Sequence, residues 1–208
     1  MPTLTESDDI TTYLQARDPL LAKYIQRASH QRVTPNTEVS LFQALVKSIV
    51  SQQLSGKAAT SIFEKIITRF GTSAEKIRNS SPQDLRACGL SQAKASTLAS
   101  TANRIVDGSI PQQEDMELMS ETDIINTLTQ VKGIGPWTAE MVLIFKLGRH
   151  DVMPATDLGI RKGYALIFGL ETKPLPQTII ERSQLWKPYR STAALYCWQS
   201  VDDTAWTA

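Results

Sequence analysis

The sequence predicts an all-α fold. Apolar residues recur at three- and four-residue spacing in segment after segment, as Leu41, Leu45 and Ile49 do, which is the pattern of an amphipathic helix. No stretch of useful length alternates apolar and polar residues, as a half-buried strand would. Residues typical of helix ends, such as Ser81-Pro82 and Asp107-Gly108, punctuate the periodic segments. We therefore expect helices joined by short loops.

The chain begins with an expected helix pair within residues 8–29, broken near Asp18-Pro19 because proline disfavours helix in the residue before it. Two amphipathic helices flank a polar loop at residues 51–57, and Gly71 is a plausible C-cap of the second. A short helix is expected to start at Ser81-Pro82 and to be followed by a turn at residues 88–91. Further helices are expected at 92–107, 116–119, 121–129, 137–147, after the loop 152–157, and twice between 176 and 202.

The composition is that of an ordinary globular protein. The 208 residues are 41% hydrophobic and 21% charged, which fits one domain or two closely packed lobes. No apolar run approaches the roughly 18 residues of a membrane span. The polar, acidic start MPTLTESDD favours neither a secretory signal nor a transit peptide. We expect a protein that is neither secreted nor bound to a membrane.

Charge and cysteine content exclude several classes of site. Cys88 and Cys197 are the only cysteines, too few for a disulfide framework or a four-cysteine cluster, and they favour a reducing compartment. The formal net charge is only +1, so bulk charge gives no indication of a nucleic-acid partner. Any affinity for DNA must come from a local surface.

The most informative segment is residues 128–139, LTQVKGIGPWTA. Gly133 and Gly135 flank one aliphatic residue between two expected helices, where a tight turn needs residues without a Cβ. The second helix then offers unpaired N–H groups that attract a phosphate, and Lys132 adds charge beside them. An ordinary helix–turn–helix connection is the alternative. The apolar Val131 and a Pro136 that opens the next helix favour the phosphate-binding hairpin.

VKGIGPWTA followed by VMPATDLGIRKG resembles the signature of the helix-hairpin-helix (HhH-GPD) base-excision DNA glycosylases, most closely the 3-methyladenine DNA glycosylase II group. The resemblance extends upstream to IVSQQLSGKAA and LSQAKASTLA, and downstream to WKPYRSTAALYCW. It covers roughly residues 40 to 200, with several motifs in consistent order. That agreement makes it far more specific than the hairpin alone.

The resemblance implies one HhH-GPD domain over residues 1–208, all-α and two-lobed, with the cleft for DNA and base between the lobes. A helical-barrel lobe of approximately residues 37–150 would contain the hairpin 128–139, and approximately 1–36 plus 151–208 would form the second lobe. It also implies a structural Na⁺ or K⁺ in the hairpin, bridging to a DNA phosphate. Its ligands would be the backbone carbonyls of Thr129, Val131 and Ile134.

Asp157 matches the catalytic aspartate of the family, in register with Pro154 and Ile160. Breaking a glycosidic bond builds positive charge on the sugar, which a fixed carboxylate stabilises. On local sequence alone, a helix N-cap is an equally good reading, and both roles can hold together. Many relatives carry a second aspartate where this chain has Thr156. Glu140 and Asp151 lack motif support, and we interpret them as surface charges.

Trp137 takes the place of the lysine with which strand-cleaving relatives form a Schiff base, twenty residues before the aspartate (157 − 137 = 20). Indole cannot act as that nucleophile, so the resemblance implies a monofunctional enzyme with water as nucleophile and no AP lyase activity. The cysteine count excludes the iron–sulfur cluster of some relatives. No cofactor is expected for catalysis.

Two tryptophans are the candidates for the base pocket. An alkylated purine carries positive charge in its nucleoside, and aromatic faces stabilise it by stacking and cation–π attraction. Trp137 and Trp198 are these candidates, and Trp198 matches a pocket tryptophan of the family. Core packing is the alternative for each. Tyr164, Tyr189 and Trp206 have weaker claims.

The resemblance also assigns the residues that would contact DNA. Chemistry on a paired base requires flipping it out of the stack, and Gln53 lies where the family inserts a plug into the duplex. A polar interhelical loop, and for the second loop a capped helix start, are the alternatives. The full set of expected DNA contacts is Gln53, Leu54, Ser55, Lys57, Lys94, Ser96, Lys132, Gly133, Gly135 and Thr138.

The expected function is a DNA-3-methyladenine glycosylase of base excision repair, which removes 3-methyladenine and 7-methylguanine from duplex DNA as a monomer. It would act in the nucleus of a eukaryote or the cytoplasm of a bacterium. The alternative is a paralogue with weak or no excision activity that acts as a DNA-damage-binding module. Thr156 and Ser55 suggest the alternative, and the intact Asp157 argues against it.

Overall fold

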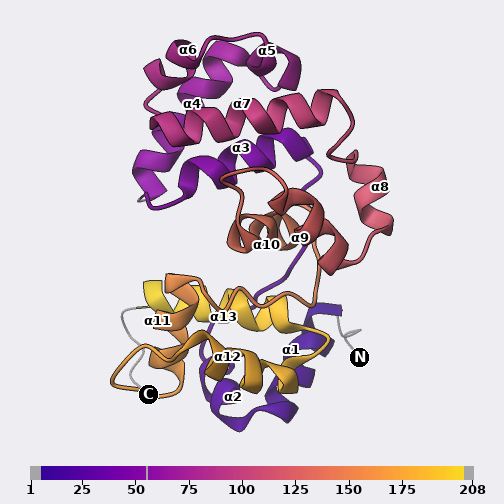
Figure 1. Ribbon diagram of the computed structural model, residues 1–208. Helices are drawn as coiled ribbons and strands as arrows, with labels where there is room; N and C mark the ends of the chain where they lie inside the picture. The colour runs from indigo at the N-terminus through magenta and orange to yellow at the C-terminus, as the bar shows by residue number, and fades with distance from the viewer. Residues whose placement is uncertain (1–5, 55, 204–208) are drawn as a thin grey trace. The chain divides into compact units, whose positions relative to one another are not determined.

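The computed structural model describes residues 6–54 and 56–203 (Figure 1). All regular secondary structure within these ranges is helical, so the predicted all-α class is confirmed. Two of the residues named above, Ser55 and Trp206, lie outside the described ranges. None of the described helices is both long and apolar enough to cross a membrane.

The chain divides into two compact units. Unit 2 is Pro35–Leu147, and unit 1 is formed by the chain up to Thr34 together with the chain from Gly148 onward. The resemblance implies these boundaries near residues 36 and 150. Each unit is described by itself below.

Unit 2 consists of eight described α-helices. They are α3 (Leu41–Ser51), α4 (Gly56–Phe70), α5 (Ala74–Arg78), α6 (Pro82–Ala87), α7 (Gln92–Val106), α8 (Gln113–Leu118), α9 (Glu121–Thr129) and α10 (Pro136–Phe145). Helix α3 packs against α4, α7 and α10, and α7 also packs against α5 and α6 (Figure 1). Buried apolar residues such as Val46, Ile66 and Leu98 form a core between α3, α4 and α7.

Most helix starts in unit 2 follow from local sequence. Ser40 and Ser81 each form a capping box, with Gln43 and Asp84 respectively, and Ser91 caps α7 by accepting a hydrogen bond from the Lys94 N–H. Helix α5 was not predicted. It has only five residues, fewer than two turns, so it contains no apolar repeat that sequence periodicity could show.

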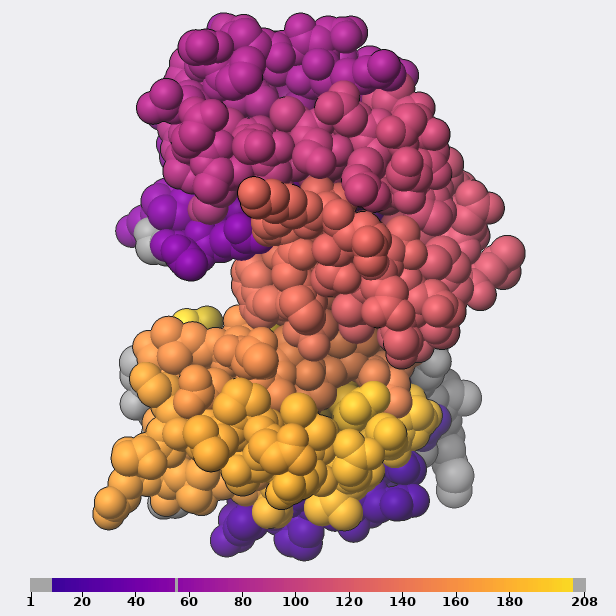
Figure 2. Space-filling view, in the orientation of Figure 1, coloured from indigo at the N-terminus to yellow at the C-terminus, as the bar shows by residue number. Residues whose placement is uncertain are grey.

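Unit 1 joins both ends of the described chain. Its helices are α1 (Glu6–Arg17), α2 (Pro19–Ile25), α11 (Leu158–Ile167), α12 (Pro176–Ser183), a 3₁₀ turn (Gln184–Trp186) and α13 (Arg190–Asp202). Figure 2 shows the late part of the chain, in orange and yellow, packed beside the indigo segment that contains α1 and α2. The core includes Leu14, Tyr24, Trp186 and Tyr196.

A buried carboxylate ties the two ends of the sequence together in unit 1. Asp18 caps α2 and accepts hydrogen bonds from Arg182 Nε and Nη2, both at 2.7 Å, and from Trp186 Nε1 at 3.0 Å. Burial alone would raise the pKa of Asp18, but the hydrogen bonds from Arg182 and Trp186 outweigh it and hold the pKa below its ordinary value. The ionised form is therefore part of the folded structure.

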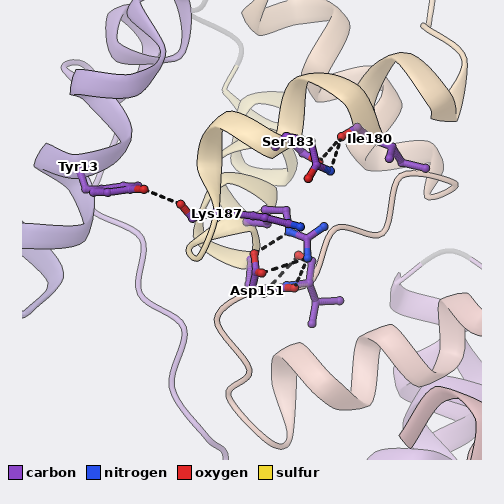
Figure 3. Close-up of polar contacts among 9 residues, drawn as sticks. Tyr13, Asp151, Ile180, Ser183 and Lys187 are labelled. Atoms are coloured by element: carbon purple, nitrogen blue, oxygen red, sulfur yellow. Dashed lines mark hydrogen bonds and ion pairs between the residues drawn. The ribbon is translucent and has the colours of Figure 1, made fainter. Parts of the chain in front are cut away.

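A second ion pair fixes the start of α13. Asp151 accepts hydrogen bonds from Arg190 Nε at 2.6 Å and Nη2 at 3.1 Å, and Figure 3 shows these contacts together with the hydrogen bond from Tyr13 to the Lys187 carbonyl. Asp151, interpreted above as a surface charge, is partly exposed and is engaged in this pair. Glu140 also differs from the prediction, since one of its carboxylate oxygens is buried.

Helices α11 and α13 approach each other more closely than side chains permit. A Cβ on Gly163 would lie 1.7 Å from the Cys197 carbonyl oxygen, so only glycine fits at this crossing. The contact brings the first turn of α11 beside the middle of α13. Asp157 precedes that turn, and Trp198 lies on α13.

Candidate active site and nucleic-acid interface

Asp157 is the N-cap of α11. Its Oδ1 atom accepts hydrogen bonds from the Ile160 backbone N–H and from Trp198 Nε1, each at 2.8 Å. The predicted cap is confirmed, and the side chain is half-buried. The carboxylate is thus held in one orientation at the positive end of a helix, which also stabilises its negative charge. The predicted catalytic role is compatible with this geometry.

Gly159 leaves the room that this arrangement needs. A Cβ there would lie 2.8 Å from Trp198 Cδ1 and 3.0 Å from Asp157 Oδ1. Any larger residue would therefore displace either the indole or the carboxylate. The prediction did not include Gly159 or Gly163. Their four-residue spacing in LGIRKG was a visible signal of a close helix contact.

Trp198, predicted to lie in the base pocket, is half-buried and packs against the core of unit 1 while it donates to Asp157. The structure thus gives it a second task, orienting the carboxylate. Two weaker candidates for the pocket belong to the core instead. Tyr164 is 4% exposed and packs against the tilted ring of Phe168, and Tyr189 packs against the same core in a T-shaped pair with Tyr13.

The hairpin in unit 2 runs from the end of α9 to the start of α10, and its two glycines have different tasks. Gly133 has a φ of +96°, and a Cβ there would lie 2.0 Å from Thr97 Oγ1, which donates to the Lys132 carbonyl. Gly135, the N-cap of α10, has an ordinary φ of −96° and open space where a Cβ would be. The missing Cβ at Gly133 therefore allows the tight turn, whereas the missing Cβ at Gly135 leaves space for another group to approach the start of α10.

The backbone carbonyls predicted to hold a monovalent cation have suitable chemistry. In the described part of the chain, no backbone hydrogen bond ends on the carbonyl of Thr129 or Ile134, and that of Val131 accepts one from the Ile134 N–H. Na⁺ and K⁺ are hard cations that prefer oxygen ligands, as Ca²⁺ and Mg²⁺ do. The three oxygens thus fit such an ion.

The predicted plug loop follows α3 and contains a residue in an unfavourable conformation. Gln53 has a φ of +56°, is exposed, and is the only described residue other than glycine with a positive φ. For a residue with a Cβ this region costs roughly 1–2 kcal/mol. The surrounding structure must therefore hold the loop in place.

Two side chains hold it. Lys94 Nζ donates to the carbonyls of Val50 and Gln52, at 2.7 and 2.6 Å, and Gln52 Nε2 donates to the Gly133 carbonyl at 3.0 Å and to Thr138 Oγ1 at 2.9 Å. The first pair satisfies carbonyls at the end of α3, and the second links the plug loop to the hairpin. Burial lowers the pKa of the Lys94 ammonium.

Two of the predicted DNA contacts also make bonds inside the protein. Lys94 uses two of its three N–H donors inside the protein, and the Thr138 side chain is 1% exposed. The bonds of both side chains help to hold the loop, and the predicted contact of Lys94 with DNA stays a prediction. Gln52, which joins the loop to the hairpin, was missed because sequence shows no bond between residues 81 or 86 positions apart. The exposed members of the predicted set that the structure describes are Gln53, Leu54, Lys57, Ser96, Lys132 and Gly133.

Trp137 lines a cavity of about 450 Å³ that lies entirely within unit 2. One wall is formed by Trp137, Met141 and Phe145, which share a face of α10, and Phe63 of α4 adds a further aromatic ring. The volume falls within the range of small-molecule pockets. The cavity therefore offers aromatic surfaces on which a planar ring can stack.

Comparison with known proteins gives a consistent result. The family described as the HhH-GPD superfamily of base excision DNA repair proteins matches residues 46–188. DNA-3-methyladenine glycosylase 1 of Schizosaccharomyces pombe is 42% identical over 163 residues, which cover 76% of this chain and 72% of the relative. The alkylbase DNA glycosidase-like protein mag2 of the same yeast is 31% identical over 192 residues, 90% of each chain.

Among solved structures, the fold is similar to that of the S. pombe 3-methyladenine DNA glycosylase in complex with abasic DNA. The TM-score is 0.85 at 35% identity, with 96% of this chain and 100% of that chain covered.

The hairpin geometry predicts different effects of alanine at its two glycines. Gly133→Ala should lower the free energy of unfolding by about 2–3 kcal/mol, because the new Cβ meets Thr97 in a left-handed turn. Gly135→Ala should change it by less than about 1 kcal/mol, because that space is open. Urea titrations of both variants measure the difference. Equal losses would show that the two glycines do not divide the tasks in this way.

Proposed function

Because the chain belongs to the HhH-GPD superfamily of base excision DNA repair proteins, we propose that it is a monofunctional DNA-3-methyladenine glycosylase. It hydrolyses the N-glycosidic bond of alkylated purines, such as 3-methyladenine and 7-methylguanine, in duplex DNA, and it acts as a monomer. The observation that carries the proposal is the carboxylate of Asp157, held by the start of α11 and by Trp198.

The reaction explains why a fixed carboxylate is needed. As the bond between sugar C1′ and the base nitrogen breaks, its electron pair leaves with the base and positive charge develops on the sugar. A carboxylate that is already oriented stabilises this charge without reorganising. Water then adds to C1′ and loses a proton, for which Asp157 or solvent is the acceptor. The products are the free base and an abasic site.

Trp137 supports both the substrate class and the absence of strand cleavage. A cationic alkylpurine is attracted to electron-rich aromatic faces, and Trp137 lines an aromatic cavity of suitable size. Indole cannot form a Schiff base with the sugar, so water remains the nucleophile. The cationic base leaves readily, and little acid catalysis is required.

The hairpin and the plug loop supply the proposed DNA contacts. The first turn of α10 offers backbone N–H groups to a phosphate, and the absence of a Cβ at Gly135 lets that phosphate approach closely. We propose that a Na⁺ or K⁺ on the carbonyls of Thr129, Val131 and Ile134 adds positive charge there. Gln53 would fill the space that the flipped nucleotide leaves.

A single assay tests the activity. The purified protein, in excess over a duplex with one 7-methylguanine, should release the base and leave abasic sites that break only after alkali is added. Borohydride should trap no covalent complex. Efficient trapping would contradict the monofunctional assignment of Trp137. Binding of the lesion without release of the base would instead favour the alternative, a paralogue that binds damaged DNA with weak or no excision. The relative mag2, described only as glycosidase-like, is one reason to test for this outcome.

Gln53→Gly should separate stability from function. Glycine relieves the positive φ at this position and should raise the free energy of unfolding by about 1 kcal/mol, while excision slows because the plug is lost. Gln53→Ala is the matched control, since it removes the plug but keeps the strain. Thermal melts and single-turnover excision measure the two effects. If both variants excise at the wild-type rate, the plug is not Gln53.

A further inference from the structure

One glutamine side chain joins the plug loop to the hairpin. Gln52 is the C-cap of α3, is half-buried and directly precedes Gln53. Its Nε2 atom donates to the Gly133 carbonyl oxygen at 3.0 Å and to Thr138 Oγ1 at 2.9 Å. A side-chain amide has two N–H donors, so both donors of Gln52 bind the hairpin and the first turn of α10. The residue beside the proposed plug is therefore tied to the proposed phosphate site.

Helix α7 holds both ends of this link. Lys94 Nζ donates to the Gln52 backbone carbonyl at 2.6 Å, and Thr97 Oγ1, three residues further along α7, donates to the Lys132 carbonyl at 3.1 Å. Lys132 is the residue before Gly133, so loop, hairpin and α7 form a closed hydrogen-bond network. Because such networks make the segments they join more rigid, the loop and the hairpin are held at a fixed spacing.

The link leaves the phosphate site open. Gln52 binds a carbonyl of the hairpin, whereas a phosphate would bind N–H groups at the start of α10. Both contacts can therefore form at the same time. A phosphate held by α10 would then lie at a set distance from the backbone of Gln53.

Resting on the proposed function, we infer that Gln52 is a positioning residue that couples phosphate binding at the hairpin to insertion of Gln53 into the duplex. The backbone of Gln53 has a φ of +56°, a conformation that persists only where the surrounding structure holds it. With Gln52 in place, a hairpin that has bound a phosphate presents the plug already oriented. Orientation in advance removes an entropic cost from the step in which the nucleotide flips.

A purely structural role of Gln52 is the alternative. In that case its two hydrogen bonds only stabilise unit 2, and their loss lowers the free energy of unfolding. Any effect of Gln52 on excision would then be independent of whether the Gln53 side chain is present. The two roles therefore differ in whether the effects of changing Gln52 and Gln53 add.

The test is a double-mutant cycle. Gln52→Met keeps the length of the side chain but removes both donors, Gln53→Ala removes the plug, and a third protein carries both changes. Gln130→Met is the matched control, since the Gln130 amide lies next to the hairpin but donates to the Asn126 carbonyl of α9. Single-turnover excision of 7-methylguanine is measured for each protein, together with a thermal melt and the binding of an undamaged duplex.

The two single variants should each slow excision by about tenfold, because a misplaced or missing plug impairs the same step. The double variant should be no slower than the slower single variant, because Gln52 then has no plug to position. Gln130→Met should excise at the wild-type rate. Binding of undamaged duplex should persist in every variant, because the phosphate contacts at α10 remain.

Three results would overturn the inference while the proposed function stands. The first is a folded Gln52→Met protein that excises at the wild-type rate, and the second is a Gln53→Ala protein that does so. The third is a double variant whose loss equals the product of the two single losses, as independent roles require. A wild-type protein that does not release 7-methylguanine would refute the proposed function itself.

A variant on the other side of the link keeps the test decisive if Gln52→Met does not fold. Thr138→Val removes one of the two acceptors of the Gln52 amide. Its loss of excision should likewise disappear in the Gln53→Ala background, and an additive loss would contradict the coupling.

Discussion

The contact between α11 and α13 is the constraint on which the geometry of Asp157 depends. Gly163 lets the helices touch at the Cys197 carbonyl, and Gly159, one turn earlier, leaves space for the Trp198 indole. The indole can then reach the carboxylate, which also accepts a hydrogen bond from the start of α11. The close packing of the two helices thus holds the Asp157 carboxylate in one orientation, as the proposed chemistry requires. Flexible carboxylates on a surface would lose this preorganisation.

Unit 2 applies the same principle to a loop. The conformation of Gln53 is unfavourable by itself, and it persists because Lys94 and Gln52 hold the backbone on either side. Gln52 also bonds to the Gly133 carbonyl, so the loop and the hairpin are parts of one hydrogen-bonded assembly. Strain held by surrounding structure is common at functional sites. Here it occurs at the residue expected to enter the duplex.

The features that the sequence predicted correctly are those that depend on residues close together in the chain. Helix periodicity and caps gave nearly all helices, as at Ser81 and Asp157, and the glycines of the hairpin marked its turn. The sequence did not predict the hydrogen bonds between residues that lie far apart in the chain. Lys94 and Thr138 looked like surface residues because a sequence carries no record of which polar groups become buried together.

The same limit hid Asp151 and Lys146. The partner of Asp151 lies 39 residues away, and the partner of Lys146, the Asn36 carbonyl, lies 110 residues away. No local pattern distinguishes a charge that bonds to a distant part of the chain from a solvated one. The family motifs indicated which positions matter, whereas the structure showed how their neighbours hold them.

The central claim is that the negative charge of Asp157 drives bond cleavage, and Asp157→Asn tests it most directly. The amide oxygen can still accept from Ile160 and Trp198, so the fold should persist with a loss of about 1 kcal/mol. The charge is gone, and comparable electrostatic deletions slow reactions by about 10²–10³. We expect a loss of that size in single-turnover excision of 7-methylguanine, with duplex binding retained. A folded variant that binds DNA and excises within threefold of wild type would contradict the account.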